Sequence, residues 1–114
     1  MNDTLDLLAV LALRRWAYDR AVLRSARTTN YKTTGWQQRS NRYADARIVR
    51  VIDFERTLAM LTPTQQEILT LVYRHGHSCS EAAALMRGNA ATLGYHLARA
   101  RHALGLILDR RGIL

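Results

Sequence analysis

The sequence predicts an all-α protein, in which a unit of three helices follows two longer amphipathic helices. Apolar residues recur at spacings of three and four in five segments, the period of a helix with one buried face. Two segments open with a Ser or Thr followed three residues later by Gln or Glu, the pattern of a capping box. The one proline, Pro63, directly follows a capping threonine, where the first turn of a helix accepts it.

The first predicted helix runs from Thr4 to about Thr28, a segment without proline or glycine. Its expected apolar face consists of Leu5, Leu8, Ala12, Trp16 and Leu23. The first half of this helix is apolar on nearly every side, because further apolar residues lie outside that face: Leu7, Val10, Leu11 and Leu13. That pattern indicates burial against more than one neighbour. Two explanations stay open, a homodimer interface, which we expect, and an intrachain core packed on the C-terminal unit.

The segment from Ser25 to Asn41 has little apolar periodicity and is predicted to be a loop or a mobile arm. It lies in a strongly basic stretch, with ten Lys and Arg residues between Arg14 and Arg50 against two aspartates. Basic residues interleaved with aromatic ones, here Trp36 among them, are typical of segments that grip a nucleic-acid backbone and stack on bases. A solvated connection with Trp36 or Tyr43 packed into the core is the alternative.

The second predicted helix spans about Tyr43 to Met60 and leads directly into Thr62. Its expected apolar face consists of Ile48, Val51, Ile52, Leu58 and Leu61. Charged residues are expected largely on the other side: Arg47, Arg50, Asp53 and Arg56.

The C-terminal unit begins at Thr62, where the hydroxyl caps a helix that has Pro63 in its first position and Gln65 three residues after the cap. This helix is predicted to run from Pro63 to about Arg74, before a polar break around Gly76. Its apolar stripe consists of Ile68, Leu69, Leu71, Val72 and Tyr73.

A second capping box, Ser78 with Glu81, opens a short helix of about two turns that ends near Met86. Ala83 provides the small side chain that a close helix crossing needs. The turn that follows is expected to use Gly88 for a positive φ and Asn89 as the next N-cap.

The third helix of the unit begins at Ala90, and its apolar face consists of Leu93, Leu97, Ala100 and Leu104. The polar side chains on the opposite face are Thr92, Tyr95, Arg99 and His102, with His96 and Arg101 on the flanks. The chain continues with more apolar residues, which are Leu106, Ile107, Leu108, Ile113 and Leu114. A solvated segment from Asp109 to Gly112 is expected to interrupt them, and they can dock on the N-terminal helix of the same chain or of a second chain.

The stretch from Thr62 to Leu104 resembles region 4 of the sigma-70 family, the helix-turn-helix that reads the upstream promoter element. The resemblance rests on Leu61-Thr62-Pro63 before the first helix, on Glu81-Ala82-Ala83 in the second, and on Thr92-Leu93 with Arg99-Ala100-Arg101 in the third. It implies a helix-turn-helix fold, binding to double-stranded DNA and RNA polymerase as a second candidate partner. Small prophage-type activators share this build, so we expect a bacterial or prophage regulator.

Two departures from the family pattern limit what the resemblance implies. In the turn, Met86-Arg87-Gly88-Asn89 places the glycine one position later than the family does. In the third helix, Gly94 and Tyr95 stand where the family carries lysine, serine or arginine, and Gly94 costs roughly 1 kcal/mol of helix propensity. The family's promoter preference is therefore not transferred to this chain.

The expected mechanism is docking of the Ala90 to Arg101 helix in the major groove. Arg87 and Arg101 are expected to contact phosphates, and Asn89, Tyr95, His96 and Arg99 to contact bases or the DNA backbone. The candidate DNA-binding residues are Arg87, Asn89, Ala90, Thr92, Tyr95, His96, Arg99 and Arg101. Residues 1–61 form the predicted N-terminal helical and basic region, for dimerisation and as an arm, and residues 62–114 the helix-turn-helix with its apolar extension.

Composition supports a polyanionic partner. The net charge is +8, and Lys32 is the only lysine among the 17 cations, so arginine, a bidentate ligand of phosphates and base edges, dominates. Two other functions remain as alternatives. One is a protein-interaction module that contacts RNA polymerase without binding DNA, and the other is a basic RNA-binding protein that uses the Ser25 to Asn41 arm.

Catalytic and metal sites are not expected. His75, His77 and Cys79 form a short connection without a fourth ligand, and Cys79 is better explained as a small buried residue. No motif of a phosphate loop or a nucleophile elbow is present, so neither enzyme activity nor a cofactor is expected. The lone cysteine excludes an intrachain disulfide. It fits a reducing compartment, and the apolar runs are too short for a membrane span, which together predict a cytoplasmic protein.

Overall fold

The computed structural model describes the backbone of residues 3–28 and 35–112, and the side chains of residues 4–25 and 46–112. Every regular element in these residues is a helix, which confirms the all-α class. The elements are α1 (Asp3–Thr28), α2 (Gly35–Leu58), α3 (Pro63–Leu69), the π-helical turn η1 (Thr70–Arg74), α4 (Cys79–Leu85) and α5 (Ala90–Arg111).

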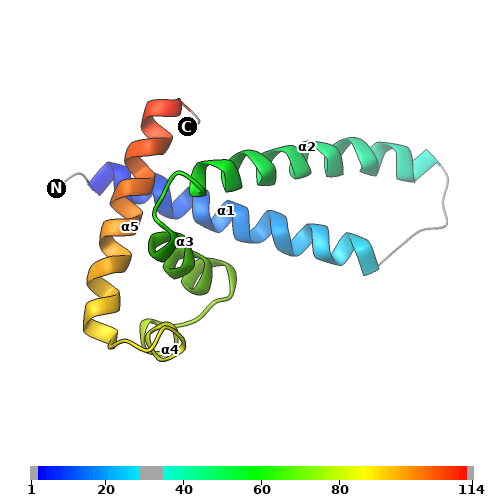
Figure 1. The fold of residues 1–114 in the computed structure, drawn as a ribbon. Coiled ribbons are helices and arrows are strands. Elements are labelled where there is room, and N and C mark those ends of the chain that lie inside the picture. Colours follow the sequence, from blue (N-terminus) through cyan, green and yellow to red (C-terminus); the bar gives the residue numbers. More distant parts are fainter. Residues whose placement is uncertain (1–2, 29–34, 113–114) are drawn as a thin grey trace.

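The helices α1 and α2 form an antiparallel hairpin, and its far end extends away from the other helices (Figure 1). The C-terminal half of α5 crosses the start of α1, while α3, η1 and α4 lie beside its N-terminal half. The described part of the apolar extension, to Leu108, therefore docks on the N-terminal helix of the same chain, one of the two arrangements that the sequence left open. Ile113 and Leu114 lie outside the described residues.

Gly105 marks the place where α5 crosses α1. It is buried, and a Cβ atom added to it would press on the carbonyl oxygen of Leu5 and lie 2.9 Å from the carbonyl carbon. Only a residue without a side chain allows the two backbones to approach this closely. Local sequence patterns do not reveal this requirement, because the obstructing atoms lie 100 positions earlier in the chain.

All three predicted N-caps of the C-terminal unit are confirmed. The Thr62 hydroxyl accepts from the Gln65 amide at 3.2 Å, and the Gln65 side chain accepts in return from the Thr62 amide. Ser78 and Glu81 form the same reciprocal pair, with distances of 3.2 and 2.8 Å. These contacts satisfy amides at the helix starts that have no partner within the helix, so each helix begins where the sequence predicts.

The predicted helix from Pro63 to Arg74 has the expected bounds but not a uniform structure. It changes at Thr70 from an α-helix to a π-helical turn, in which the His75 amide donates to the Thr70 carbonyl at 3.0 Å. Arg74, the last residue of this turn, places its guanidinium over the indole ring of Trp16, 5.9 Å from the ring centroid. The turn thus connects the C-terminal unit to α1.

The buried stripe of α1 differs from the predicted one. Leu5 and Trp16 are buried as expected, but Leu8, Ala12 and Leu23 are only half-buried. Ala9 and Leu13, both 0% exposed, take their place. The reason is that α1 packs against α5, α2 and η1 together, and this turns its core face toward Ala9 and Leu13.

The predictions for α2 and for the preceding loop require two corrections. The helix α2 begins at Gly35 and not at Tyr43, and α1 extends to Thr28, so much of the predicted Ser25 to Asn41 loop is helical. Residues 29–34 lie outside the described residues.

The core face of α2 is also rotated from the predicted one. Val51, Leu58 and Leu61 are buried with Phe54, whereas Ile48 and Ile52 are 40% and 45% exposed. This rotation brings Arg47 and Arg50 from the predicted outer face to the buried carboxylate of Asp19.

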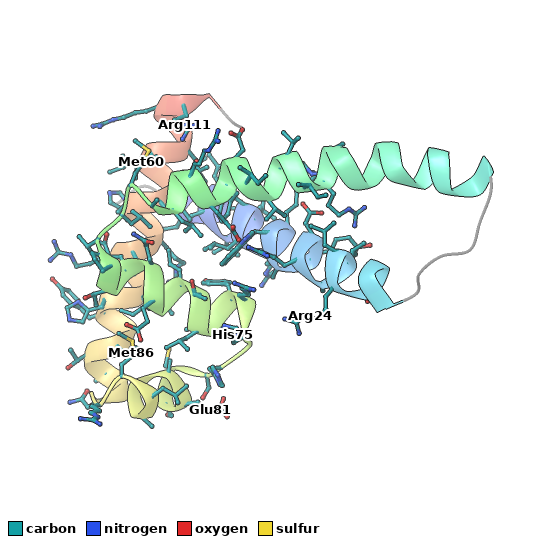
Figure 2. All side chains as sticks on the ribbon, turned by 45° about the vertical axis from the view of Figure 1, so that its right-hand side comes forward. Arg24, Met60, His75, Glu81, Met86 and Arg111 are labelled. Atoms are coloured by element: carbon teal, nitrogen blue, oxygen red, sulfur yellow. The ribbon has the colours of Figure 1, made fainter. Side chains whose placement is uncertain are left out.

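The end of α5 is longer than expected. The predicted solvated segment from Asp109 to Gly112 is exposed as expected, but it does not end the helix, because α5 continues to Arg111 and ends at Gly112, which has a positive φ of 64°. Arg111 donates to the hydroxyl of Thr57, which is buried at the end of α2, and lies beside Met60 (Figure 2). This contact fastens the last turn of α5 to α2.

Candidate nucleic-acid interface

One side of α5 is buried and the opposite side is open, as its sequence period predicts. Leu93, Leu97, Ala100 and Leu104 are all buried, which confirms the predicted core face. Four exposed side chains lie on the opposite side of the N-terminal half, and we call them the recognition face: Thr92, Tyr95, His96 and Arg99. His102, the next residue along this side, is half-buried and lies 3.9 Å from Asp6 of α1.

Tyr95 and Arg99 form a pair at the centre of the recognition face. The Arg99 guanidinium donates to the Tyr95 hydroxyl at 2.9 Å and lies 5.6 Å from the centroid of its ring. The His96 ring packs edge-on against Tyr95. A spacing of four residues on a helix signals such contacts, but the sequence analysis missed the pair. The hydrogen bond orients a guanidinium whose other N–H groups stay available to a ligand.

Asn89 and Ala90 stand at the start of α5. The Asn89 side-chain oxygen accepts from the Thr92 amide at 2.9 Å, so this oxygen is used by the cap while the side-chain NH2 group points to no described partner. Ala90 is exposed and occupies the first helical position. Unpaired amides at a helix start favour a phosphate, and a small side chain allows close approach.

The turn before α5 departs from the prediction. The residue with a positive φ is Arg87, at 58°, and not Gly88. The Gly88 amide donates to the Ala83 carbonyl at 2.8 Å and the Arg87 amide to Ala84 at 3.2 Å, the two bonds of a Schellman helix end. In that motif the left-handed position comes directly after the C-cap, which is Met86, so the hydrogen bonds assign it to Arg87 and not to the glycine.

Arg87 is consequently a strained residue. An L-residue other than glycine in this conformation costs roughly 1–2 kcal/mol. No other described non-glycine residue has a positive φ, and the Arg87 side chain is exposed at the end of α4, next to the start of α5.

Arg101 lies apart from the other candidates. It is half-buried, and its guanidinium donates to the Tyr73 hydroxyl of η1 at 3.2 Å. The structure therefore gives Arg101 a contact that holds α5 against η1, while the other seven candidate residues are all exposed on the turn and the first half of α5.

No metal site is formed by the part of the chain that the structure describes, where no three His, Cys, Asp or Glu side chains gather. Cys79 is a free thiol and is half-buried, so the prediction of a buried residue is only partly correct. Among the described residues, no helix combines the length and apolar character that crossing a bilayer requires.

Residues 52–104 match the family model for sigma-70, region 4. The C-terminal half of the chain carries a sigma-70 region 4-like domain. The match begins inside α2, earlier than the resemblance at Thr62 indicated, and ends at Leu104, within α5. No curated protein and no solved structure matches the chain.

The sigma-70 region 4 family consists of helix-turn-helix modules that bind DNA, and it is not an enzyme family. In the matching domain of this chain, Glu81 at the start of α4 is fully exposed, and hydrogen bonds from the Ser78 backbone and side chain hold the pKa of its carboxyl below the ordinary value of 4.5. This carboxylate keeps α4 capped at neutral pH, and α4 in turn supports α5.

Proposed function

We propose that the protein is a sequence-specific transcriptional regulator that docks α5 in the major groove of duplex DNA. The observation that carries this proposal is the recognition face, which stays exposed on the helix whose other side is buried in the region 4-like domain. In helix-turn-helix proteins this helix places its N-terminal residues on the base edges, while the helix before it crosses the backbone.

The exposed candidate residues fall into two groups, those that can donate hydrogen bonds to base edges and those that can contact a phosphate. Arg99, oriented by Tyr95, has the fork of donors that pairs with guanine O6 and N7. The free NH2 group of Asn89 and the side chains of Thr92 and His96 supply further donors. Arg87 and the first amides of α5, at Ala90, face the position of a phosphate. Arg101 would have to leave Tyr73 to reach one, so its contribution is indirect, through the position of α5.

Selection from a random duplex pool tests sequence specificity directly. We expect enrichment of a defined site, and Arg99→Ala is expected to weaken binding to that site by about 5- to 100-fold while relaxing preference at one base pair. Arg110→Ala is the matched control, since it removes the same charge from an exposed position at the other end of α5. Recovery of no preferred sequence, or equal losses in both variants, would contradict the proposal.

A protein-interaction module is the second candidate, and exposed apolar residues of the domain favour it. Leu85 of α4 and Tyr95 of α5 are each 58% exposed, and a partner protein docked on this end of the domain would cover them. The partner implied by the family is RNA polymerase. Retention of polymerase by the protein without any retention of duplex DNA at about 100 mM salt would favour this function. Tighter binding to single-stranded RNA than to duplex would favour an RNA-binding protein.

We also propose a homodimer. Leu7 and Leu11 are 58% and 52% exposed on the side of α1 that faces away from its buried stripe, and a second copy would cover them. The mass in solution tests this, with a dimer expected for the parent protein and a monomer for Leu7→Glu with Leu11→Glu. A parent protein that stays monomeric at high concentration would rule the dimer out.

A further inference from the structure

A cavity of about 280 Å³ lies between α1 and α2, and no residue of α3, α4 or α5 lines it. Its apolar wall consists of Ala12, Trp16, Val51 and Phe54, with the two aromatic rings 5.5 Å apart and tilted by 38°. This volume is just below the range of drug-sized sites, roughly 300–1,000 Å³, so it suits a small ligand. A wall built of two aromatic rings favours a ligand that carries a ring of its own.

Asp19 brings a buried negative charge to the wall of the cavity. It is 3% exposed, and its partners are Arg50, at 3.3 and 3.4 Å, and Arg47, at 3.7 Å. Charge-assisted hydrogen bonds usually measure about 2.7–2.9 Å, so these contacts are long. A carboxylate has about four acceptor positions. Asp19 therefore keeps acceptor capacity for a further donor such as an ammonium group.

Arg15 brings the complementary charge. It also lines the cavity, is exposed, and pairs with no described side chain. It precedes Asp19 by four residues on α1, and such positions lie about 5–6 Å apart on one face of a helix. An ammonium group and a carboxylate on neighbouring atoms of one ligand can bridge that gap.

We propose that this cavity binds an aromatic amino acid. The ring packs against Trp16 and Phe54, the ammonium group donates to Asp19, and the carboxylate accepts from Arg15. Arg50 and Asp53 also line the cavity, and Arg50 pairs with Asp19, so the ligand adds one contact to Asp19 and one to Arg15 while its ring covers the apolar wall.

The Trp16 side chain connects the cavity to the helix-turn-helix. Its indole N–H donates to Glu55 at 3.0 Å, and its ring carries the Arg74 guanidinium of η1, which is followed by the Ser78 cap of α4. A ligand that moves the indole ring changes the contact between α1 and η1. Bound ligand is therefore expected to change DNA affinity, and DNA to change ligand affinity by the same factor. This coupling rests on the proposed function, but binding to the cavity does not.

Calorimetric titration of the 114-residue chain with L-phenylalanine tests the site. We expect saturable binding of one molecule per chain with a Kd of about 1 mM or tighter, which suits a ligand of roughly a dozen heavy atoms. Phenethylamine and phenylacetate each lack one charge and are expected to bind at least about tenfold more weakly. L-alanine, which lacks the ring, is expected not to bind.

Two variants make the result specific to the cavity. Arg15→Gln is expected to weaken L-phenylalanine binding about tenfold or more, whereas Arg14→Gln, at an exposed position that does not line the cavity, is expected to leave it unchanged. Ala12→Leu fills the cavity and is expected to abolish binding while the thermal transition is retained.

Absence of saturable binding at about 10 mM L-phenylalanine, or equal affinity in Arg15→Gln and the parent protein, would overturn the inference. Binding of L-phenylalanine by a protein that retains no duplex DNA would remove the proposed function and leave the cavity site in place.

Discussion

The two halves of α5 each contain a glycine, and the surroundings of these two glycines differ. Gly94, in the exposed half, has no atom within 4 Å of an added Cβ, while Gly105, in the buried half, would drive its Cβ into the backbone of Leu5. One glycine is a cost in helix propensity without a packing reason, and the other is required by the crossing of two helices. Residue type alone does not reveal which is which.

The strained turn extends this comparison. Where α5 packs on α1, the chain places glycine at the position that needs it. Where α5 begins, it places Arg87 in the left-handed conformation and glycine one position later, at Gly88, where an added Cβ would meet nothing. Backbone strain retained at an exposed cation is typical of functional positions. The packed half of α5 therefore has glycine where the helix crossing needs it. At the exposed end, the chain keeps a strained arginine, Arg87, and a glycine, Gly94, that packing does not require.

Gly105→Ala should show the largest effect. The added methyl group meets backbone atoms, which cannot rotate away, so the free energy of unfolding is expected to fall by about 3 kcal/mol or more. Urea denaturation followed by circular dichroism measures the change.

Gly94→Ala is the matched control in the same helix. With open space around the new methyl group, alanine is expected to raise the free energy of unfolding by roughly 1 kcal/mol. Similar changes in the two variants would contradict the distinction between the halves.

Arg87→Gly tests whether the left-handed backbone at this position serves DNA binding or only lowers stability. Glycine removes the cost of the left-handed conformation, and after its own entropic cost the expected gain is about 0.5–1 kcal/mol of unfolding free energy. The same variant is expected to bind duplex DNA more weakly, with the slope of log affinity against log salt reduced by about 0.9, as for one lost phosphate contact. Greater stability with unchanged DNA binding would mean that the strain has no role in recognition.

The smallest expected effect is the acid sensitivity of the α4 cap. Because the pKa of Glu81 is lowered in the folded protein, its contribution is present above 4.5 and is lost as the pH falls through the lower folded value. Glu81→Gln can keep the capping geometry without this titration, so its urea midpoint should fall less between pH 6 and 3 than that of the parent. Glu67→Gln removes the same charge from α3 away from any cap and should behave like the parent protein.

The predictions that depended on local hydrogen bonding were the most accurate. Thr62, Ser78 and Asn89 all cap their helices, because a cap requires only residues three positions apart. The core face of α5 was equally predictable, since its period is regular. The orientation of α2 was not, because Asp19 draws Arg47 and Arg50 inward and leaves Ile48 and Ile52 outside.

The same limit applies to the candidate site. The exposed side of α5 follows from its period, but the left-handed residue of the turn depends on which carbonyls the Arg87 and Gly88 amides reach. The cavity between α1 and α2 requires the meeting of two helices, and no pattern within either one marks it.

The π-helical turn η1 holds one residue more per turn than an α-helix would. In a regular α-helix, one inserted residue would rotate all that follows by about 100°, and the wider turn takes up that residue without the rotation. Deleting one residue from Thr70–Arg74 would therefore change which side chains of the turn face Trp16 and Arg101, and would leave the direction of α5 relative to the hairpin nearly unchanged. The turn is a place where the chain can differ in length by one residue without reorienting its two ends.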